Sequence, residues 1–174
     1  MSSLAPSRTL VVAAASRHAG TDEIADRLAW VLENDLRPGW RVLRRDVLDL
    51  QALDDADAVV LGSAIYFGYW LKPAARALAY LNDAANVDLW MFSSGPVSEH
   101  ESENGQAIAA NSLVGSRLAI EHKVFGGRLD TSRLTLLERT ALRAVRAKPG
   151  DYRDWDEIDT WGHRIADKLK LVAV

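Results

Sequence analysis

The sequence predicts a doubly wound α/β fold, in which helices cover both faces of a parallel β-sheet. Short, almost wholly apolar segments alternate with longer segments in which apolar residues recur at helical spacing. The apolar segments contain too few polar residues for strands with one face in water, so both of their faces must be covered. At 174 residues the chain is long enough for a substantial core, and we expect residues 1–174 to form a single domain.

The first half of the chain supplies three predicted strands and two helices. A buried strand is expected at Thr9–Ala15, and a helix follows at Thr21–Leu36, where Pro38-Gly39 ends it. The next segment, Arg41–Val47, alternates polar and apolar residues, as a half-covered edge strand does. A second buried strand is expected at Ala58–Ala64. The helix that follows it is predicted at Lys72–Asn82.

The second half continues the alternation. A buried strand is expected at Val87–Ser93, a helix at Glu103–Leu118 and a short fifth strand at His122–Gly126. A further helix is predicted at Ser132–Ala147. The last helix follows Asp154, whose carboxylate is a typical N-cap, and extends to about Leu169. Right-handed crossovers between the strands then place helices on both faces of the sheet.

Composition excludes several classes of function. The chain has no cysteine, which excludes disulfides, cysteine-ligated iron–sulfur clusters and cysteine nucleophiles, so redox chemistry would need a bound cofactor. A net charge of −3 gives no reason to expect nucleic-acid binding. The start, MSSLAPSR, lacks the apolar stretch of a secretion signal, and no segment approaches the ~18 apolar residues of a membrane span. The expected location is the cytoplasm.

Ligands of doubly wound sheets bind beyond the carboxyl ends of the strands, where the strand order reverses. The segment after the first strand is suited to a phosphate group. It offers hydroxyls, small residues, a guanidinium and the N–H groups of a helix start, in the order Ser16, Arg17, His18, Ala19, Gly20, Thr21. A tight turn with a threonine cap would explain the same residues.

Other phosphate-binding and regulatory classes lack their motifs here. The chain contains neither G-x-x-x-x-G-K-[ST] nor G-x-G-x-x-G after the first strand, which excludes the P-loop and the dinucleotide fingerprint. A phosphorylated receiver needs acidic residues at the ends of the first and third strands, where this chain has Ala14-Ala15-Ser16 and Leu61-Gly62-Ser63. The four histidines are scattered, so no metal site is expected.

Two further loops are suited to a flat ring. Aromatic side chains favour ring faces, and backbone N–H and C=O groups suit a polar ring edge. The residues in question are Ser63, Ala64, Ile65, Tyr66, Phe67 and Gly68 in one loop, and Ser94, Gly95, Pro96 and Val97 in the other. Each aromatic residue alone would equally suit the core or an interface. From the residues alone, the prediction is a phosphorylated planar ligand.

Five stretches carry a resemblance to a known family: SRHAGTDEIADRLA, DADAVVLGSAIYFGYW, LWMFSSGPV, HKVFGGRLD and GDYRDWDEI. Together they resemble the flavodoxin-domain family that includes the menaquinone-dependent protoporphyrinogen dehydrogenases, from about Arg8 to Leu169. The resemblance implies a five-stranded parallel sheet in the order 2-1-3-4-5 and one FMN. It places the phosphate at Ser16–Thr21 and the flavin ring at Ser63–Gly68 and Ser94–Val97. It further implies an oxidoreductase that passes electrons to a quinone or another acceptor, with no catalytic side chain assigned.

The chain departs from the family in one position. Relatives have glycine directly after the residue matching His18, as in S-x-H-G-x-T, whereas this chain has Ala19 there and Gly20 next. If that position requires a positive φ, alanine costs on the order of 1 kcal/mol, and FMN binds more weakly. Two alternatives therefore stay open: an electron carrier with a protein redox partner, and a flavodoxin-fold protein that has lost FMN. A deazaflavin in place of FMN would fit the same residues.

Residues 129–153 form an elaboration between the fifth strand and the last helix, and they resemble the extra segment of the protoporphyrinogen dehydrogenases. The charge within 132–148 is one-sided: Arg133, Arg139, Arg143, Arg146 and Lys148 against Glu138. Such a helix suits peripheral contact with an anionic membrane, attraction of porphyrin carboxylates, or a dimer contact. A solvated charged face over packed leucines would explain the same pattern. The oligomeric state stays open.

Overall fold

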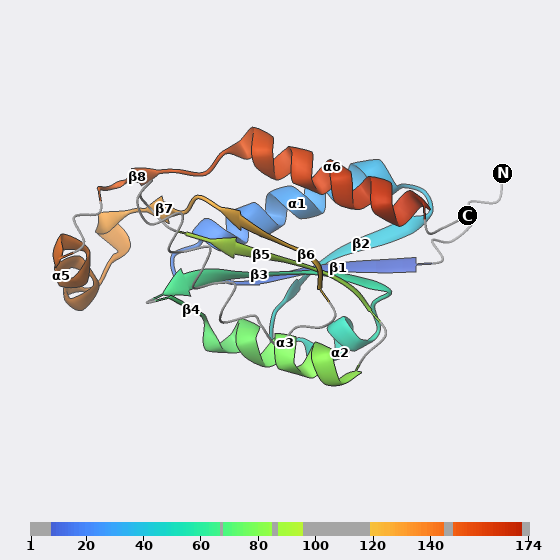
Figure 1. The fold of residues 1–174 in the computed structure, drawn as a ribbon, viewed down its shortest axis with the longest axis horizontal. Helices are drawn as coiled ribbons and strands as arrows, with labels where there is room; N and C mark the ends of the chain where they lie inside the picture. The colour runs from blue at the N-terminus through green and yellow to red at the C-terminus, as the bar shows by residue number, and fades with distance from the viewer. Residues whose placement is uncertain (1–7, 67, 85–86, 96–118, 145–147, 172–174) are drawn as a thin grey trace.

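The structure is a computed structural model that describes residues 8–66, 68–84, 87–95, 119–144 and 148–171. Its centre is a parallel sheet with strand order β2-β1-β3-β5-β6 (Figure 1). Since β5 and β6 are the fourth and fifth parallel strands along the chain, this is the predicted order 2-1-3-4-5. The parallel strands are β1 (Arg8–Ala15), β2 (Trp40–Asp46), β3 (Ala58–Tyr66), β5 (Asp88–Ser94) and β6 (Ala119–Phe125).

Helices cover both faces of this sheet, as predicted: α1 and α6 lie on one face, and α2 and α3 on the other (Figure 1). In β1, Leu10 and Val12 belong to the core on the α1–α6 face, whereas Val11 and Ala13 belong to the core on the α2–α3 face. This alternation is why the strand sequence is apolar throughout. The helices are α1 (Gly20–Leu36), α2 (Leu50–Asp54), α3 (Lys72–Ala84) and α6 (Trp155–Leu171).

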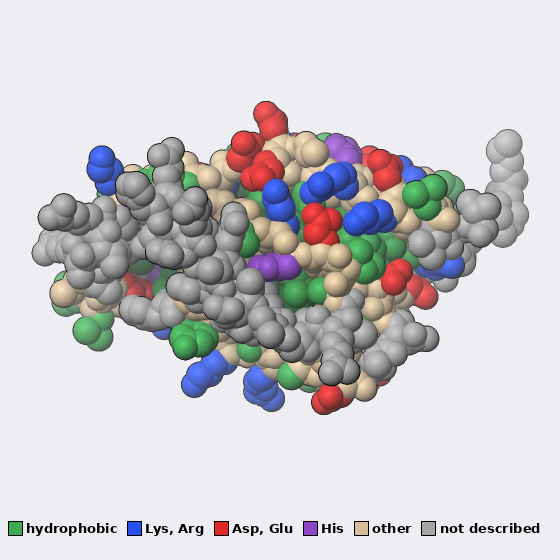
Figure 2. Space-filling view, in the orientation of Figure 1, with side chains coloured by type: hydrophobic (Ala, Val, Ile, Leu, Met, Phe, Trp, Pro, Cys, Tyr) green, Lys and Arg blue, Asp and Glu red, His purple; other side chains and the backbone are tan. Residues whose placement is uncertain are grey.

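Helices α1 and α6 pack closely because of a glycine. A Cβ atom added at Gly162 would lie 2.9 Å from Val31 Cγ1, closer than real Cβ contacts. The predicted cap of α6 is confirmed, since the Glu157 N–H donates to Asp154 Oδ1 at 3.0 Å. On the face shown in Figure 2, basic and acidic side chains are interspersed rather than gathered by sign. One of the ion pairs between β6 and α6 joins Glu121 to Arg164 at 3.1 Å.

The segment between β6 and α6 folds outside the sheet (Figure 1). We call residues 129–153 the insert. Two short strands, β7 (Arg128–Leu129) and β8 (Gly150–Asp151), pair antiparallel at its two ends. Between them lie a 3-10 turn (Thr131–Arg133) and helix α5 (Leu136–Ala144). The short ribbon holds the ends of the insert together.

The prediction of one helix over 132–147 is wrong in the described part of that range, because Thr135 caps a helix that begins at Leu136. The Thr135 N–H and hydroxyl donate to Glu138 Oε2 at 2.8 and 2.9 Å, and the Glu138 N–H donates to Thr135 Oγ1 at 3.3 Å. This reciprocal pattern is a capping box. Leu137 does not pack in a core either, since it is 85% exposed.

Other differences are small. Strand β6 begins at Ala119, earlier than the predicted His122. Neither α2 nor β4 (Tyr69–Trp70), which pairs antiparallel with the end of β3, was predicted from the sequence. The predicted helix at 103–118 lies outside the described residues. Among the residues described, no helix combines the length and apolar character needed to cross a membrane.

Candidate functional site

The three loops predicted to hold a ligand leave neighbouring positions of one sheet edge. Ala15 at the end of β1 is opposite Ser63, and Ala64 is opposite Ser94 at the end of β5. The strand order reverses between β1 and β3, so this edge is the switch point where such sheets bind ligands. We call the segments the β1–α1 loop (Ser16–Thr21), the β3 loop (Ser63–Gly68) and the β5 loop (Ser94–Val97).

The β1–α1 loop ends in a helix start that no side chain caps. Helix α1 begins at Gly20, its N-cap residue is Ala19, and no side-chain hydrogen bond caps it. The alternative of a threonine cap is therefore wrong; Thr21 lies inside the first turn and is 2% exposed. An uncapped helix start presents backbone N–H groups and the positive end of the helix dipole, which suit an anion such as a phosphate.

Ala19 occupies a backbone conformation that favours glycine. Its φ is 65° and its ψ −13°, and it is the one non-glycine residue with a positive φ among those described. Alanine in this region costs on the order of 1 kcal/mol relative to glycine. In this chain, the position at which the motif S-x-H-G-x-T has glycine therefore has a positive φ.

Two carboxylates in the first turn of α1 would repel a phosphate if they were unpaired, but arginines neutralise both. Arg44 Nη2 lies 2.7 Å from Asp22 Oδ1, and Glu23 pairs with Arg128 at 2.9 Å and Arg153 at 2.7 Å. Burial acts to raise the pKa of Glu23, but the hydrogen bonds and charges of the two arginines outweigh it and lower the pKa. The helix start therefore stays suited to an anion.

Arg17 and His18 connect the β1–α1 loop to the β3 loop. The Arg17 guanidinium carbon lies 5.0 Å from the centre of the Tyr66 ring, and the His18 ring centre lies 6.4 Å from it. Burial, and secondarily the charge of Glu138, raises the pKa of Tyr66 despite the opposing charge of Arg17. The phosphate and ring segments predicted separately are therefore in contact.

Glu138 reaches this contact from the insert, and sequence reasoning missed it. Its Oε1 lies 3.2 Å from Arg17 Nη1 and 3.3 Å from His18 Nε2. The Thr135 N–H, and to a lesser extent the Thr135 hydroxyl and His18, lowers the pKa of Glu138 although partial burial opposes this. The motif T-x-x-E at Thr135 predicts the capping box. Nothing in the sequence predicts the partner in a loop 120 residues away.

Buried hydrogen bonds fix the bases of the β3 and β5 loops. Ser63 is fully buried, and its hydroxyl donates to the Ala64 carbonyl and accepts from the Leu71 N–H. Ser93, also fully buried, accepts from Trp70 Nε1 at 2.8 Å and lies 2.8 Å from His122 Nε2. This side of the site is thus held from within the sheet.

The loops themselves are partly described. Ile65 and Tyr66 are half-buried, Ala64 and Ser94 are buried, and positive φ angles of 81° and 122° occur at Gly68 and Gly95. Such turns let backbone approach a ligand closely. The candidate residues Phe67, Pro96 and Val97 lie outside the described residues.

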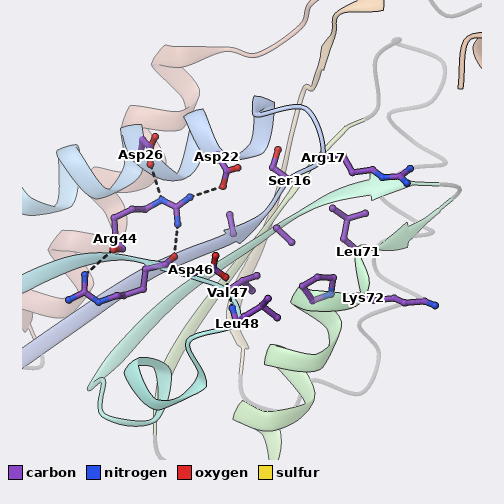
Figure 3. A pocket seen from close by; sticks show the side chains of 14 residues that line it. Ser16, Arg17, Asp22, Asp26, Arg44, Asp46, Val47, Leu48, Leu71 and Lys72 are labelled. Carbon is purple, nitrogen blue, oxygen red and sulfur yellow. Dashed lines mark hydrogen bonds and ion pairs between the residues drawn. The ribbon is translucent and has the colours of Figure 1, made fainter. Parts of the chain in front are cut away.

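A cleft of about 890 Å³ lies on the other side of the β1–α1 loop, and the sequence did not indicate it (Figure 3). Of the candidate residues, Ser16 and Arg17 line it; the β3 and β5 loops do not. The remaining lining comes from the end of β1, the first turns of α1, the end of β2 with the turn after it, and the segment that leads into α3. Arg44 crosses one wall and pairs with both Asp22 and Asp26. The charges of these three side chains are therefore paired with one another.

Metal chemistry finds no support within the described ranges, where no three or more His, Asp or Glu side chains gather as a metal site would require. The polar groups at the sheet edge are backbone amides, hydroxyls and arginines. This donor set suits a phosphate with an attached aromatic ring better than a cation.

Comparisons with known proteins identify the same architecture. A family model of the flavodoxin domain matches residues 11–156. A flavodoxin from the domain Archaea superposes with a TM-score of 0.59 at 16% identity, over 93% of this chain and 99% of that one. Flavodoxin 2 from Bacillus cereus gives 0.56 at 19% identity, over 93% and 99%. No curated protein matches significantly.

A larger enzyme contains a similar domain. Rubredoxin oxygen:oxidoreductase from Desulfovibrio gigas superposes with a TM-score of 0.58 at 19% identity over 95% of this chain, which spans 37% of that protein's length. The family match covers all three loops at the switch point, and the uncapped helix start fits the phosphate of a flavin nucleotide. This chain therefore belongs to the flavodoxin-domain family, as a flavodoxin-like redox protein whose cofactor is FMN.

Proposed function

We propose that this protein is an FMN-dependent oxidoreductase of the protoporphyrinogen dehydrogenase type, which passes electrons from a reduced porphyrin-type substrate to a quinone or another acceptor. The insert supports this proposal most. It resembles the extra segment of the protoporphyrinogen dehydrogenases, and Glu138 from its helix contacts the β1–α1 loop directly. When bound, FMN supplies the redox chemistry, and the protein supplies position and electrostatics.

In the proposed site, different loops bind different parts of FMN. The β1–α1 loop holds the phosphate with its hydroxyls and the N–H groups at the start of α1. The β3 and β5 loops hold the ring, with Tyr66 as the described aromatic contact and the positive-φ turns at Gly68 and Gly95 letting the backbone approach the ring edge. Arg17, over the Tyr66 ring, lies where the two parts meet.

An electron carrier with a protein redox partner is the second candidate. Tyr69 favours it, because this side chain is 68% exposed on β4, beside the β3 loop. An exposed aromatic residue next to the proposed ring site is a typical contact for a protein partner. A carrier needs no small-molecule substrate.

The α5 surface supports a further part of the proposal, namely peripheral contact with an anionic membrane in which quinone dissolves. Leu136 and Leu137 are 81% and 85% exposed, and Arg133 and Arg139 are exposed beside them. Apolar and basic side chains together on one short helix suit the headgroup region of such a membrane. The cytoplasm is the proposed compartment.

Phosphate placement is tested with Ser16→Glu, which puts a carboxylate among the proposed phosphate donors. Ser16 is half-buried, so it tolerates the change better than the buried Thr21. We expect FMN affinity to fall at least tenfold through charge repulsion. Gln51→Glu on the exposed surface of α2 adds the same charge as a control and leaves affinity unchanged. Equal FMN affinity in Ser16→Glu and the parent contradicts the placement.

The FMN-loaded protein is then assayed for steady-state oxidation of protoporphyrinogen with menaquinone as the acceptor. Sustained turnover that is lost in Ser16→Glu supports the enzyme. A flavin that exchanges electrons with a reduced redox protein but shows no turnover supports the carrier instead. Absence of FMN binding contradicts both.

A further inference from the structure

The insert and the residues at its ends contact the β1–α1 loop on both sides of the strained residue Ala19. On one side, Glu138 binds the side chains of Arg17 and His18 at 3.2 and 3.3 Å. On the other side, Arg153 Nη1 donates to the Gly20 carbonyl at 3.2 Å. Figure 1 shows the insert at the end of the molecule where β1 and β3 finish. The residues flanking Ala19 are therefore held from outside the sheet.

Both groups that make these contacts are themselves fixed. The Glu138 side chain is 13% exposed, and its second oxygen is held by the Thr135 capping box. The Arg153 side chain is 3% exposed, donates to both oxygens of Asp151 at 2.8 and 2.6 Å, and stacks on Trp155 at 4.5 Å. Each contact thus joins the loop to an anchored side chain rather than to a free surface residue.

The backbone of the insert also contacts the residues that follow β6. A Cβ atom added at Gly126 would lie 1.9 Å from the Tyr152 carbonyl oxygen, so only glycine allows this approach. The Tyr152 N–H donates to the Gly127 carbonyl at 3.0 Å. The end of the insert therefore has a defined position next to β6, and through Arg153 so does the start of α1.

The contacts leave the hydroxyls and the backbone N–H groups of the β1–α1 loop available to a phosphate. Glu138 binds side chains, and Arg153 binds a carbonyl oxygen and the Glu23 carboxylate at 2.7 Å. The start of α1 keeps no side-chain cap. A side-chain cap from the insert would have occupied the N–H groups that an anion needs. Contacts to carbonyl oxygens and to side chains hold the loop and leave these N–H groups open.

We infer that the insert is a clamp that holds the β1–α1 loop, with Ala19 at positive φ, in the conformation that binds FMN. This inference rests on the proposed placement of the phosphate. Glycine at residue 19 would adopt the conformation without strain, whereas alanine needs surrounding contacts to keep it there. Glu138 and Arg153 are positioning residues in this account, because they act on the cofactor through the loop.

The test combines Glu138→Ala with Ala19→Gly. Apoprotein is titrated with FMN, and the dissociation constant is measured from quenching of flavin fluorescence. Glu138→Ala weakens binding about tenfold, Glu138→Gln less, and adding Ala19→Gly to Glu138→Ala restores most of the affinity. Glu121→Ala is the matched control, since Glu121 also pairs with two cations, Arg164 and Lys168, but on the β6–α6 surface. Its FMN affinity equals that of the parent.

Three results overturn the clamp. FMN affinity in Glu138→Ala equal to the parent's means that the insert does not organise the loop. Tighter binding in that variant means that Glu138 competes with the phosphate for Arg17 and His18. Hydrogen exchange of apoprotein amides in residues 17–23 separates this inference from the proposed function, because it needs no FMN. Glu138→Ala raises these exchange rates and the added Ala19→Gly lowers them again; unchanged rates overturn the clamp even where the parent binds FMN.

Discussion

The β1–α1 loop and the β3 and β5 loops leave the same sheet edge, but different interactions hold them. Ion pairs hold the β1–α1 loop from outside, and the Arg17 side chain in one of them is 54% exposed. The β3 and β5 loops start from Ser63 and Ser93, which are fully buried and hydrogen-bonded within the protein. The conformation of the β1–α1 loop therefore depends on ion pairs, whereas that of the β3 and β5 loops depends on buried hydrogen bonds.

This difference determines how each side responds to change. Exposed ion pairs contribute little individually and weaken as salt rises. A buried donor or acceptor that loses its partner costs much more, because water cannot replace the partner. We therefore expect the β1–α1 loop to change FMN affinity with little effect on global stability. Changes beneath the β3 and β5 loops should act on stability first.

The largest effect is expected from Ser93→Val, which removes the hydroxyl between Trp70 and His122. The buried Trp70 N–H and the half-buried His122 ring lose their partner, so the free energy of unfolding should fall by at least about 2 kcal/mol. Urea denaturation measures it. Ser16→Val in the β1–α1 loop makes the same chemical change at a half-buried position and should cost far less stability. Equal losses in the two variants would contradict the distinction.

The pH dependence of stability should also separate the two sides. Burial lowers the pKa of His122 below its ordinary value of 6.5. The unfolded chain then binds a proton at His122 more readily than the folded protein does. The contribution of neutral His122 to the free energy of unfolding is therefore complete above pH 6.5 and is lost as the pH falls below that value. Urea denaturation at pH 8, 6 and 5 should show falling stability in the parent and a weaker dependence in His122→Gln. The same slope in both proteins would rule out His122 as its source.

Tyr66→Ala tests the ring side through the cofactor. An aromatic contact with a flat ring contributes on the order of 1 kcal/mol, which corresponds to about a fivefold weaker dissociation constant. Fluorescence titration of apoprotein with FMN measures the change, and the exposed Tyr69→Ala is the control. If Tyr66→Ala binds FMN with the parent's affinity and quenching, the ring lies elsewhere.

The sequence was sufficient to predict what depends on local pattern. Runs such as Leu10–Ala15 are apolar at every position because successive residues such as Val11 and Val12 face opposite layers, and this pattern predicts a covered parallel strand. The same pattern predicts the switch point and the loops that leave it. The positive φ at Ala19 was suggested by the family's glycine at that position, because glycine there indicates a strained turn.

Features that depend on distant partners were not predicted. Glu138 pairs with His18 across 120 residues, and Arg153 with Glu23 across 130. The spacing of apolar residues along the chain does not indicate which distant side chains pair. Helix α5 begins at Leu136, directly after the Thr135 capping box, rather than at the predicted Ser132. The cleft in Figure 3 arises from four separate segments, so no single stretch of sequence indicates it.

Acid should affect the β1–α1 loop at a lower pH than it affects the region around His122. Hydrogen bonds from Thr135, and then the bond and charge of His18, lower the pKa of Glu138 below its ordinary value of 4.5, against the effect of partial burial. The stabilisation is present above pH 4.5 and is lost as the pH falls through the folded-state value. Other carboxylates titrate in the same range, so the measurement compares parent and Glu138→Gln in urea between pH 5 and 3. As the pH falls, the free energy of unfolding should decrease more steeply in the parent than in Glu138→Gln. Parallel curves of this free energy against pH would contradict a role for the Glu138 carboxylate.

The smallest expected effect concerns the outer surface of α5, which lies beyond both sides of the site. Leu137 is exposed there together with Arg139, so apolar burial and charge would act together at an anionic membrane. Each basic residue near such a surface contributes about 1 kcal/mol at most, and salt screens it within about 8 Å at physiological ionic strength. We expect weak, salt-sensitive sedimentation with phosphatidylserine vesicles, reduced severalfold by Arg139→Glu and by Leu137→Ser.

Arg164→Glu on α6 has the same charge change away from this helix and should leave vesicle binding unaltered. FMN affinity should match the parent's in all three variants, since none of these side chains belongs to the proposed cofactor site. Vesicle binding equal to the parent's in Arg139→Glu and Leu137→Ser would mean that the α5 surface is merely solvated.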